Sequence, residues 1–285
     1  MAHLMAEPAN VRLSLTNHSE NVLLVREMLT GVAETIDLES SDLYDIRTAV
    51  TEACNNVVLH AYEGDEGPLE VELRASLDGV EVIVRDHGIG IRPRIRPASE
   101  TALGIGLPLI QALVHSVEFS DCNGSGTEVR MRFQTPSKRV LDPISDQQPQ
   151  EVPLPAQSED TMTTTLVIAP ASLARAVLPR VLCVLAARAN FSTDRISDAQ
   201  LVADSLAAHV PGSLGESTLS LAIGMRTGSL ELCVGPFGAG SADRLILDSS
   251  VHGLGPVIEK LTDGRSVAAI GPAGEMLALQ LIDRP

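Results

Sequence analysis

The sequence predicts an α/β protein of the α+β sandwich type, with helices on one face of a mixed, largely antiparallel sheet, and it predicts this fold twice in tandem. Three observations lead to this prediction. Short runs that alternate apolar and polar residues are interspersed with longer helical stretches. Several neighbouring strands are joined by tight turns, which favours antiparallel pairing. A proline-rich stretch then divides the 285 residues into two parts of similar size.

The elements of the first part follow in a clear order. The sequence predicts a strand at 11–17, helices at about 19–35 and 41–62, strands at 69–76 and 80–86, a helix at about 106–115, and strands at 117–121 and 127–133. Asp78-Gly79 lies between two alternating runs and is a strong hairpin signal. In the second helix an apolar stripe recurs every three or four residues and should face the sheet. It consists of Ile46, Ala49, Val50, Ala53 and Val57.

The stretch 134–161 holds five prolines and no apolar period, so it reads as an extended linker. We therefore expect a first domain at 1–135, a linker at 136–161 and a second domain at 162–285. The first domain has a net charge of −11 and the second a net charge of −2. The two halves are similar in size but differ in surface charge.

Composition excludes several classes of protein. The formal charge is −16, from 21 basic and 37 acidic residues, which argues against direct nucleic-acid binding. The chain has no Trp, and its four cysteines lie far apart, which disfavours a zinc knuckle or a disulfide framework. No apolar run reaches membrane-spanning length and the N-terminus does not resemble a signal peptide, so we expect no membrane association and a cytoplasmic location.

The second helix carries the first candidate site. Thr48, Glu52, Asn56 and His60 are spaced by four residues and share one face. A glutamate can accept a proton, and an asparagine oxygen is a suitable ligand for Mg²⁺. A solvated polar stripe on an amphipathic helix would have the same pattern.

The segment 85–91 follows a strand directly and carries a second set of candidates. Gly88 and Gly90 would let the backbone approach a ligand closely. Asp86 could accept a hydrogen bond from an exocyclic amine. An ordinary turn also uses Asp and Gly, so this motif is weak when taken alone.

Two further glycine-bearing segments follow. Gly104 and Gly106 open a helix, and amides at a helix N-terminus bind phosphate well, although a packing role explains them equally. Pro108 fits because it falls in the first helical turn. The stretch 124–129 reads as a ligand-binding turn or simply as a hairpin.

In this order and at these separations, the four segments resemble the nucleotide site of the GHKL ATPases, which include gyrases and histidine kinases. Glu52 and Asn56 resemble the N box, 86–90 the first glycine box, 104–106 the second, and Gly126-Thr127 the last motif. The run TEACNNVVLHAY, the short lid between Ile91 and Leu103, and the run GIGLPLI are most similar to the anti-sigma-factor serine kinases. The resemblance covers about residues 11–133.

The resemblance implies the GHKL (Bergerat) ATP-binding fold and a role for each matching residue. Glu52 would be the general base for a serine hydroxyl on an anti-sigma-factor antagonist, and Asn56 would ligate the Mg²⁺ that bridges the ATP phosphates. Asp86 would bind the adenine amine, with assistance from Thr127. The protein would also bind a sigma factor.

The glycines would complete that nucleotide site. Gly88 and Gly90 would give the nucleotide room, and the amides of Gly104, Ile105 and Gly106 would hold phosphate. Three lid residues, Arg92, Arg94 and Arg96, either contact phosphate or an acidic partner, or lie in a solvated loop.

The second part aligns with the first at an offset of about 150 residues. In this alignment Asp204 corresponds to Glu52, Ala208 to Asn56 and Pro236 to Asp86. The glycines are kept, because Gly238 and Gly240 correspond to Gly88 and Gly90. Alanine cannot ligate a metal and proline has no carboxylate, so we expect residues 162–285 to fold without binding ATP usefully. Domains of the resembled family generally pair as homodimers. The second part would therefore act as a tethered partner in an intramolecular pseudo-dimer, or as an independent docking surface, and homodimers of the whole chain remain possible.

The leading hypothesis is an ATP- and Mg²⁺-dependent serine kinase that also binds a sigma factor. A non-catalytic, ATP-sensing interaction module would need the same pocket and is the main alternative. A scaffold that does not use ATP is a third hypothesis, and it predicts no stabilisation by Mg-ATP.

Overall fold

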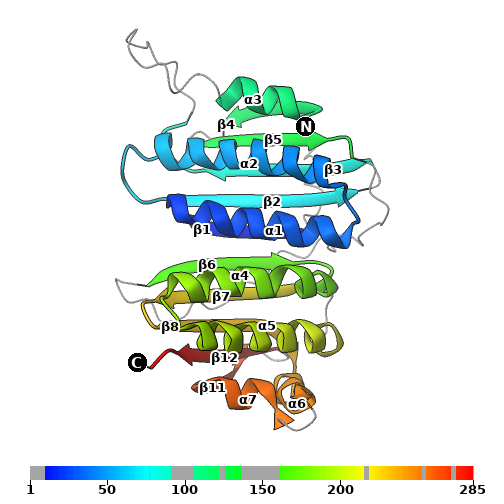
Figure 1. Cartoon of the computed structure of the whole chain (residues 1–285), viewed down its shortest axis with the longest axis vertical. Coiled ribbons are helices and arrows are strands. Elements are labelled where there is room, and N and C mark those ends of the chain that lie inside the picture. Colours follow the sequence, from blue (N-terminus) through cyan, green and yellow to red (C-terminus); the bar gives the residue numbers. More distant parts are fainter. Residues whose placement is uncertain are drawn as a thin grey trace.

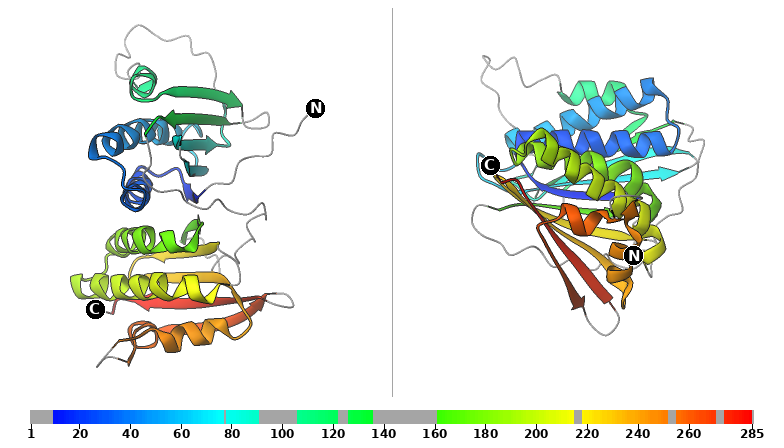
Figure 2. Two further views of the ribbon diagram at one scale, coloured as in Figure 1. Left: turned by 90° about the vertical axis from the view of Figure 1, so that its right-hand side faces the viewer. Right: turned by 60° about the horizontal axis from the view of Figure 1, so that its bottom comes forward.

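The computed structural model of the chain describes residues 10–76, 78–90, 106–121, 126–135, 161–214, 218–251, 255–270 and 274–284 (Figure 1). The helices pack on one face of a ten-stranded sheet, as the left view of Figure 2 shows. The expected α+β sandwich with helices on one face is therefore confirmed. The linker expected at 136–161 lies outside the described residues except for Thr161.

The first half begins with a strand, a short 3₁₀ turn and two helices. In chain order its elements are β1 (Val11–Thr16), η1 (Ser19–Asn21), α1 (Val22–Thr35), α2 (Ser40–His60), β2 (Pro68–Ser76), β3 (Gly79–Asp86), α3 (Gly106–Leu113), β4 (Ser116–Asp121) and β5 (Thr127–Phe133). Their bounds lie within a few residues of the expected ones, because alternation and helical periodicity are both strong in this half.

The second half begins in the same way. In chain order its elements are β6 (Met162–Ile168), η2 (Ala171–Leu173), α4 (Ala174–Arg188), α5 (Thr193–Ser213), β7 (Leu219–Arg226), β8 (Ser229–Gly238), α6 (Ser241–Asp248), β9 (Ser250–Val251), β10 (Gly255–Pro256), α7 (Val257–Leu261), β11 (Gly264–Ile270) and β12 (Gly274–Ile282). Helix α6 and the small β9–β10 pair stand between β8 and α7 in the chain.

The strand order repeats as well. The large sheet runs β11-β12-β8-β7-β6-β1-β2-β3-β5-β4, and its described pairings are all antiparallel. When only strands of the large sheet are counted, outward from the middle, each half has the order first, second, third, fifth, fourth. The expected tandem repetition of the fold is therefore confirmed.

The two halves join through their first strands. β1 and β6 pair antiparallel, from Val11 opposite Ile168 to Ser14 opposite Thr165, so one sheet crosses the junction. Helices α1 and α4 lie side by side above this pairing (Figure 1). The halves are thus an intramolecular pair that shares a continuous sheet.

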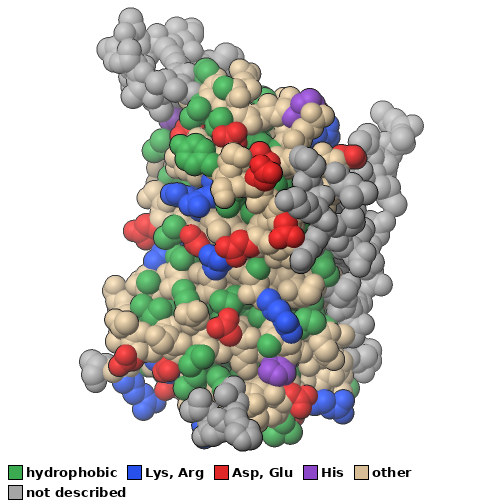
Figure 3. All heavy atoms as spheres, turned by 45° about the vertical axis from the view of Figure 1, so that its right-hand side comes forward, with side chains coloured by type: hydrophobic (Ala, Val, Ile, Leu, Met, Phe, Trp, Pro, Cys, Tyr) green, Lys and Arg blue, Asp and Glu red, His purple; other side chains and the backbone are tan. Residues whose placement is uncertain are grey.

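Charged side chains reinforce this junction. Arg180 on α4 contacts Glu34 at 2.7 Å and Glu27 at 3.6 Å, both on α1. Arg188 contacts Glu20 at 3.3 Å and donates to Asn21 Oδ1 at 2.5 Å. In Figure 3 acidic and basic side chains meet across the middle of the molecule, where the halves join.

The core lies between the helices and the sheet. The predicted stripe of α2 is fully packed: Ile46, Ala49, Val50, Ala53 and Val57 are each at most 4 % exposed. Because these residues hold one side of α2 against the sheet, the side that carries Glu52 and Asn56 is turned away from the sheet and remains half-buried.

The opposite face of the first half's sheet carries charges instead of helices. Alternate residues of β1, β2, β3 and β5 form a cross-strand network of ion pairs on this face. Its pairs are Arg12–Glu72, Arg74–Glu72, Arg74–Glu81, Arg85–Glu72, Arg85–Glu128, Arg130–Glu81, Arg130–Glu128 and Arg132–Glu81. Each glutamate in it contacts at least two arginines, so the network compensates charge on a face that none of the described helices covers.

Candidate functional site

The polar side of α2 faces the beginning of α3. Glu52 and Asn56 lie one turn apart on α2 and are half-buried. A Cβ placed on Gly106, the first residue of α3, would lie 3.1 Å from Glu52 Oε2 and 3.8 Å from Asn56 Oδ1. The structure therefore brings a carboxylate, a carboxamide and the N-terminus of α3 together. Such an N-terminus favours negatively charged groups.

The turn after β3 is built around Asp86. This carboxylate is only 4 % exposed, and its Oδ1 accepts a hydrogen bond from the Gly88 amide at 2.9 Å. Gly90 has φ of +72° and Gly126 has φ of +83°, in the region that favours glycine. A Cβ on Gly126 would lie 2.1 Å from the Asp86 carbonyl oxygen, so the two glycine turns are in contact.

Thr127 lies beside the same carboxylate. Its neighbour Glu128 pairs with Arg85 in the β3–β5 register, and this register places Thr127 alongside Asp86. Thr127 is half-buried. Two residues that the sequence assigned to one adenine site therefore lie next to each other at the same end of the sheet.

The C-terminal end of α2 is tied to this turn. The Ile89 amide donates to the Ala61 carbonyl at 2.9 Å, and a Cβ on Gly88 would lie only 2.0 Å from that oxygen. The hydroxyl of Tyr62 accepts a hydrogen bond from the His87 amide at 2.9 Å and donates to the Pro68 carbonyl at 2.6 Å. The helix that carries Glu52 and the turn that carries Asp86 are therefore joined by direct hydrogen bonds.

The sequence analysis gave Tyr62 no role. One signal was available: the chain has only two tyrosines, and this one stands directly after the helix that carries the polar face. Its partners are backbone groups at Pro68 and His87, and a sequence pattern does not specify such side-chain contacts to the backbone.

The two histidines near this site lie at its edge, and several other candidates lie outside the described residues. His60 is half-buried at the end of α2. His87, to which the sequence analysis gave no role, is exposed and has Nε2 3.4 Å from Glu70 Oε1. Gly104, Ile105 and the three lid arginines (Arg92, Arg94 and Arg96) lie outside the described residues.

The corresponding region of the second half lacks the polar pair. Asp204 is exposed on α5, and Ala208 stands one turn further along. Gly240, with φ of +73°, donates its amide to Glu275 Oε1 at 2.8 Å, so a side chain from β12 closes this turn. Helix α6 begins immediately afterwards.

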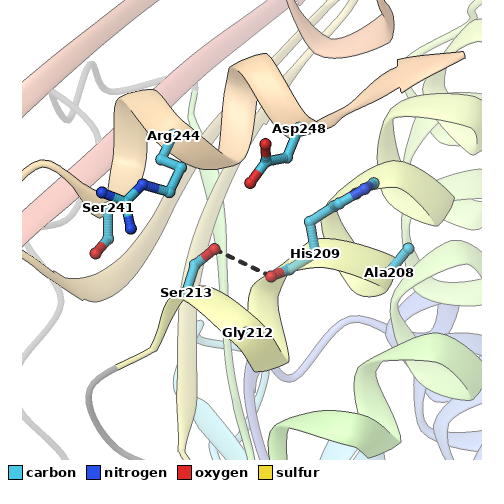
Figure 4. Close-up of a pocket in the computed structure, with 7 residues that line it drawn as sticks. All are labelled: Ala208, His209, Gly212, Ser213, Ser241, Arg244 and Asp248. Carbon is cyan, nitrogen blue, oxygen red and sulfur yellow. Dashed lines mark hydrogen bonds between the residues drawn. The ribbon is translucent and has the colours of Figure 1, made fainter.

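A cavity of about 230 Å³ lies between the end of α5 and α6 (Figure 4). It is lined by Ala208, His209, Gly212, Ser213, Ser241, Arg244 and Asp248. The Ser213 hydroxyl donates to the His209 carbonyl at 3.1 Å, as in an ordinary helix end. The lining residues are exposed or half-buried, so this hollow is shallow and open to solvent.

Within the described part of the chain, no group of three His, Cys, Asp or Glu side chains is placed to hold a metal ion. The cysteines described there, Cys54, Cys183 and Cys233, are all free. Burial raises the pKa of the Cys54 thiol to about 12, so this cysteine is inert at neutral pH. Over the same residues, each helix is too short or too polar to cross a membrane.

Comparison with known proteins identifies the family of the first half. Residues 15–133 match the model of the histidine kinase-like ATPase domain. The serine-protein kinase RsbW of Halalkalibacterium halodurans is 31 % identical over 130 residues, which span 41 % of this chain and 80 % of that protein. The anti-sigma F factor of Thermoanaerobacter sp. (strain X514) is 29 % identical over 129 residues, 42 % of this chain and 90 % of its own. RsbW of Bacillus cereus (strain Q1) is 26 % identical over 133 residues, 42 % of this chain and 83 % of its own.

Proposed function

This chain belongs to the anti-sigma-factor serine kinase family of histidine kinase-like ATPases, and we propose that its first half uses ATP and Mg²⁺ to phosphorylate a serine on an anti-sigma-factor antagonist. We propose in addition that the protein binds a sigma factor, and that it acts in the cytoplasm, where ATP is available. The relatives' names, a serine-protein kinase and an anti-sigma factor, support both activities.

One observation carries the proposal: Glu52 Oε2 and Asn56 Oδ1 lie together in front of Gly106 at the start of α3. In the proposed reaction Glu52 accepts the proton of the serine hydroxyl as its oxygen attacks the γ-phosphorus of ATP, and ADP leaves. Amides at the start of α3 would hold the phosphates. Phosphoryl transfer depends mainly on positioning and charge neutralisation, so few side chains are needed.

The residues present fit a magnesium ion bound together with a nucleotide. Mg²⁺ usually takes one or two protein oxygens and fills its remaining positions with phosphate and water oxygens. Asn56 Oδ1 would be the protein ligand, because it lies beside the start of α3, where amides would hold the phosphates. When bound, the ion would neutralise phosphate charge.

The base of the nucleotide would lie at the turn after β3. Asp86 would accept a hydrogen bond from the adenine amine, and Thr127 would assist it. Gly88 and Gly90 would provide space, and the amides of Gly104, Ile105 and Gly106 would hold phosphate. The hydrogen bond from the Gly88 amide to Asp86 Oδ1 supports this role, because it holds the carboxylate in one orientation.

The second half would serve as a tethered partner that does not bind ATP. We propose domains at 1–135 and 162–285, with a linker at 136–161. Ala208 in place of Asn56, and α6 directly after the Gly240 turn, support the loss of nucleotide binding. The β1–β6 pairing supports the role of partner.

The test uses labelled ATP, the full chain and candidate antagonists, with phosphoserine detected by mass spectrometry. Glu52→Gln should keep ATP affinity, because it changes no group assigned to the nucleotide, and should abolish phosphate transfer. Glu39→Gln is the matched control. Glu39 is exposed at the start of the same helix, about 20 Å from Glu52 by helix rise.

Unchanged transfer by Glu52→Gln would remove the proposed base. If wild-type protein binds ATP and its partner without producing phosphoserine, the non-catalytic ATP-sensing module becomes the better description. Absence of ATP binding would contradict both functions.

A further inference from the structure

Tyr62 forms a hydrogen-bonded bridge between three parts of the first half. Its hydroxyl accepts from the His87 amide at 2.9 Å and donates to the Pro68 carbonyl at 2.6 Å. The ring packs closely against Gly67, where a Cβ would lie 2.1 Å from the ring carbon Cε1. Both the ring and the hydroxyl therefore have fixed positions.

The bridge lies at the point where two strands end together. Leu69 pairs with Asp86 in the β2–β3 register, so Pro68 and His87 are the next residues outward on the two strands. Tyr62 follows α2 and reaches both of them. Tyr62 therefore fixes the position of His87, the residue next to Asp86, with respect to the helix that carries Glu52 and Asn56.

The orientation of the Asp86 carboxylate depends on the backbone of the residues that follow it. Its Oδ1 accepts from the Gly88 amide at 2.9 Å, and Gly88 in turn lies against the Ala61 carbonyl. A shift of the His87 amide away from the Tyr62 hydroxyl would move residues on both sides of it. Asp86 and Gly88 are the two immediate neighbours.

We propose that Tyr62 is a positioning residue that sets the preference of the site for adenine over guanine nucleotides. This inference rests on the proposed function. Adenine presents an amine where guanine presents a carbonyl oxygen. A correctly oriented Asp86 carboxylate therefore accepts a hydrogen bond from the adenine amine and repels the guanine oxygen. Tyr62 acts on this choice through the His87 backbone and touches no phosphate or serine.

The experiment compares Tyr62→Phe with Tyr44→Phe in the full chain. Phenylalanine keeps the ring against Gly67 and removes only the hydroxyl. Tyr44, on α2, is 70 % exposed and provides the matched control. Calorimetry with Mg-ATP and Mg-GTP should show ATP affinity reduced about fivefold in Tyr62→Phe, the size of one net hydrogen bond, and GTP affinity unchanged. Exchange of the His87 amide hydrogen, followed by NMR without nucleotide, should be faster in Tyr62→Phe only.

Equal ATP affinity in Tyr62→Phe and wild type would overturn this inference and leave the proposed function intact. Equal weakening of ATP and GTP would also overturn it, because a purely structural role predicts that pattern. Wild-type protein that binds neither nucleotide would overturn the proposed function, and this inference with it.

Discussion

Gly31 on α1 lies directly against the backbone carbonyl of Ala176 on α4. A Cβ at Gly31 would come within 2.4 Å of that oxygen and 2.8 Å of its carbon. Because the obstacle is backbone in the first turn of a packed helix, it cannot move away as a flexible side chain could. This contact lets the two halves approach closely enough for β1 and β6 to pair beneath it.

We therefore predict that Gly31→Ala destabilises the protein by about 1 to 3 kcal/mol, the usual cost of overpacking. Gly212 in α5 is the matched control, because nothing lies within 4 Å of its Cβ position. Gly212→Ala should be neutral or stabilising by up to about 1 kcal/mol. Urea unfolding of both variants measures the difference. Equal stability of the two would show that α1 and α4 are not held at this distance in solution.

Asn10 should be a second point of attachment. It is 2 % exposed; its Oδ1 accepts from the Ala75 amide at 2.6 Å, and its Nδ2 donates to the Ala169 carbonyl at 3.3 Å. It therefore links β2 to the end of β6. Asn10→Ala should cost about 1 to 3 kcal/mol, because it leaves two backbone groups without partners. Thermal unfolding checks this. Asn17→Ala, which removes a more exposed side chain, should cost less.

The charged face of the sheet predicts a loss of stability in acid. Burial alone would raise the pKa of Glu72, but the hydrogen bonds and charges of Arg85 and Arg12 outweigh it and lower this pKa below its ordinary 4.5. The pKa of Glu128 is lowered in the same way by Arg85 and Arg130. A lowered folded-state pKa gives stability that is present above about pH 4.5 and lost as the pH falls through the folded value.

Unfolding free energy measured from pH 7 to pH 3 should fall accordingly. Glu72→Gln should cost about 1 to 3 kcal/mol at pH 7 and show a shallower fall below pH 4.5. Glu118→Gln, at a side chain that is 63 % exposed, should follow the wild-type curve. A Glu72→Gln curve parallel to wild type down to pH 3 would contradict the pairing.

The number of nucleotides bound per chain tests whether only the first half binds ATP. Calorimetry should give one Mg-ATP per chain, and ATP at about 100 times its Kd should add about 2.7 kcal/mol to stability. Asn56→Ala should abolish both effects. Ala208→Asn should leave the stoichiometry at one, because Pro236 still occupies the place of Asp86. Two bound nucleotides in the wild type would refute the loss of binding in the second half.

The elements of the first half could be predicted because each is encoded locally. The stripe from Ile46 to Val57 fixes which side of α2 is buried, and therefore which side presents Glu52 and Asn56. The alternation in β3 places Asp86 at its end and on the helix-covered side. Gly88 and Gly90 were predicted from the sequence as positions of close backbone approach, and a Cβ at either would lie 3.2 Å or less from a backbone oxygen.

Other features depend on contacts between distant residues. Alternation makes β1 and β6 strands but does not specify that they pair with each other, because both first strands have free edges until the halves meet. The role of Tyr62 depends on two backbone groups, at Pro68 and His87. Helix α6 was not predicted, because the second half was interpreted by its alignment with the first, which has no predicted helix at that place.

The shared sheet has an evolutionary consequence. In a symmetric dimer every mutation appears twice, on both sides of the axis. Here the two sides are encoded separately, so Arg180 can be selected on one helix while Glu27 and Glu34 are selected on the other. Because both halves lie in one chain, their association does not depend on how much protein the cell makes. One half could then lose nucleotide binding while the other half kept it.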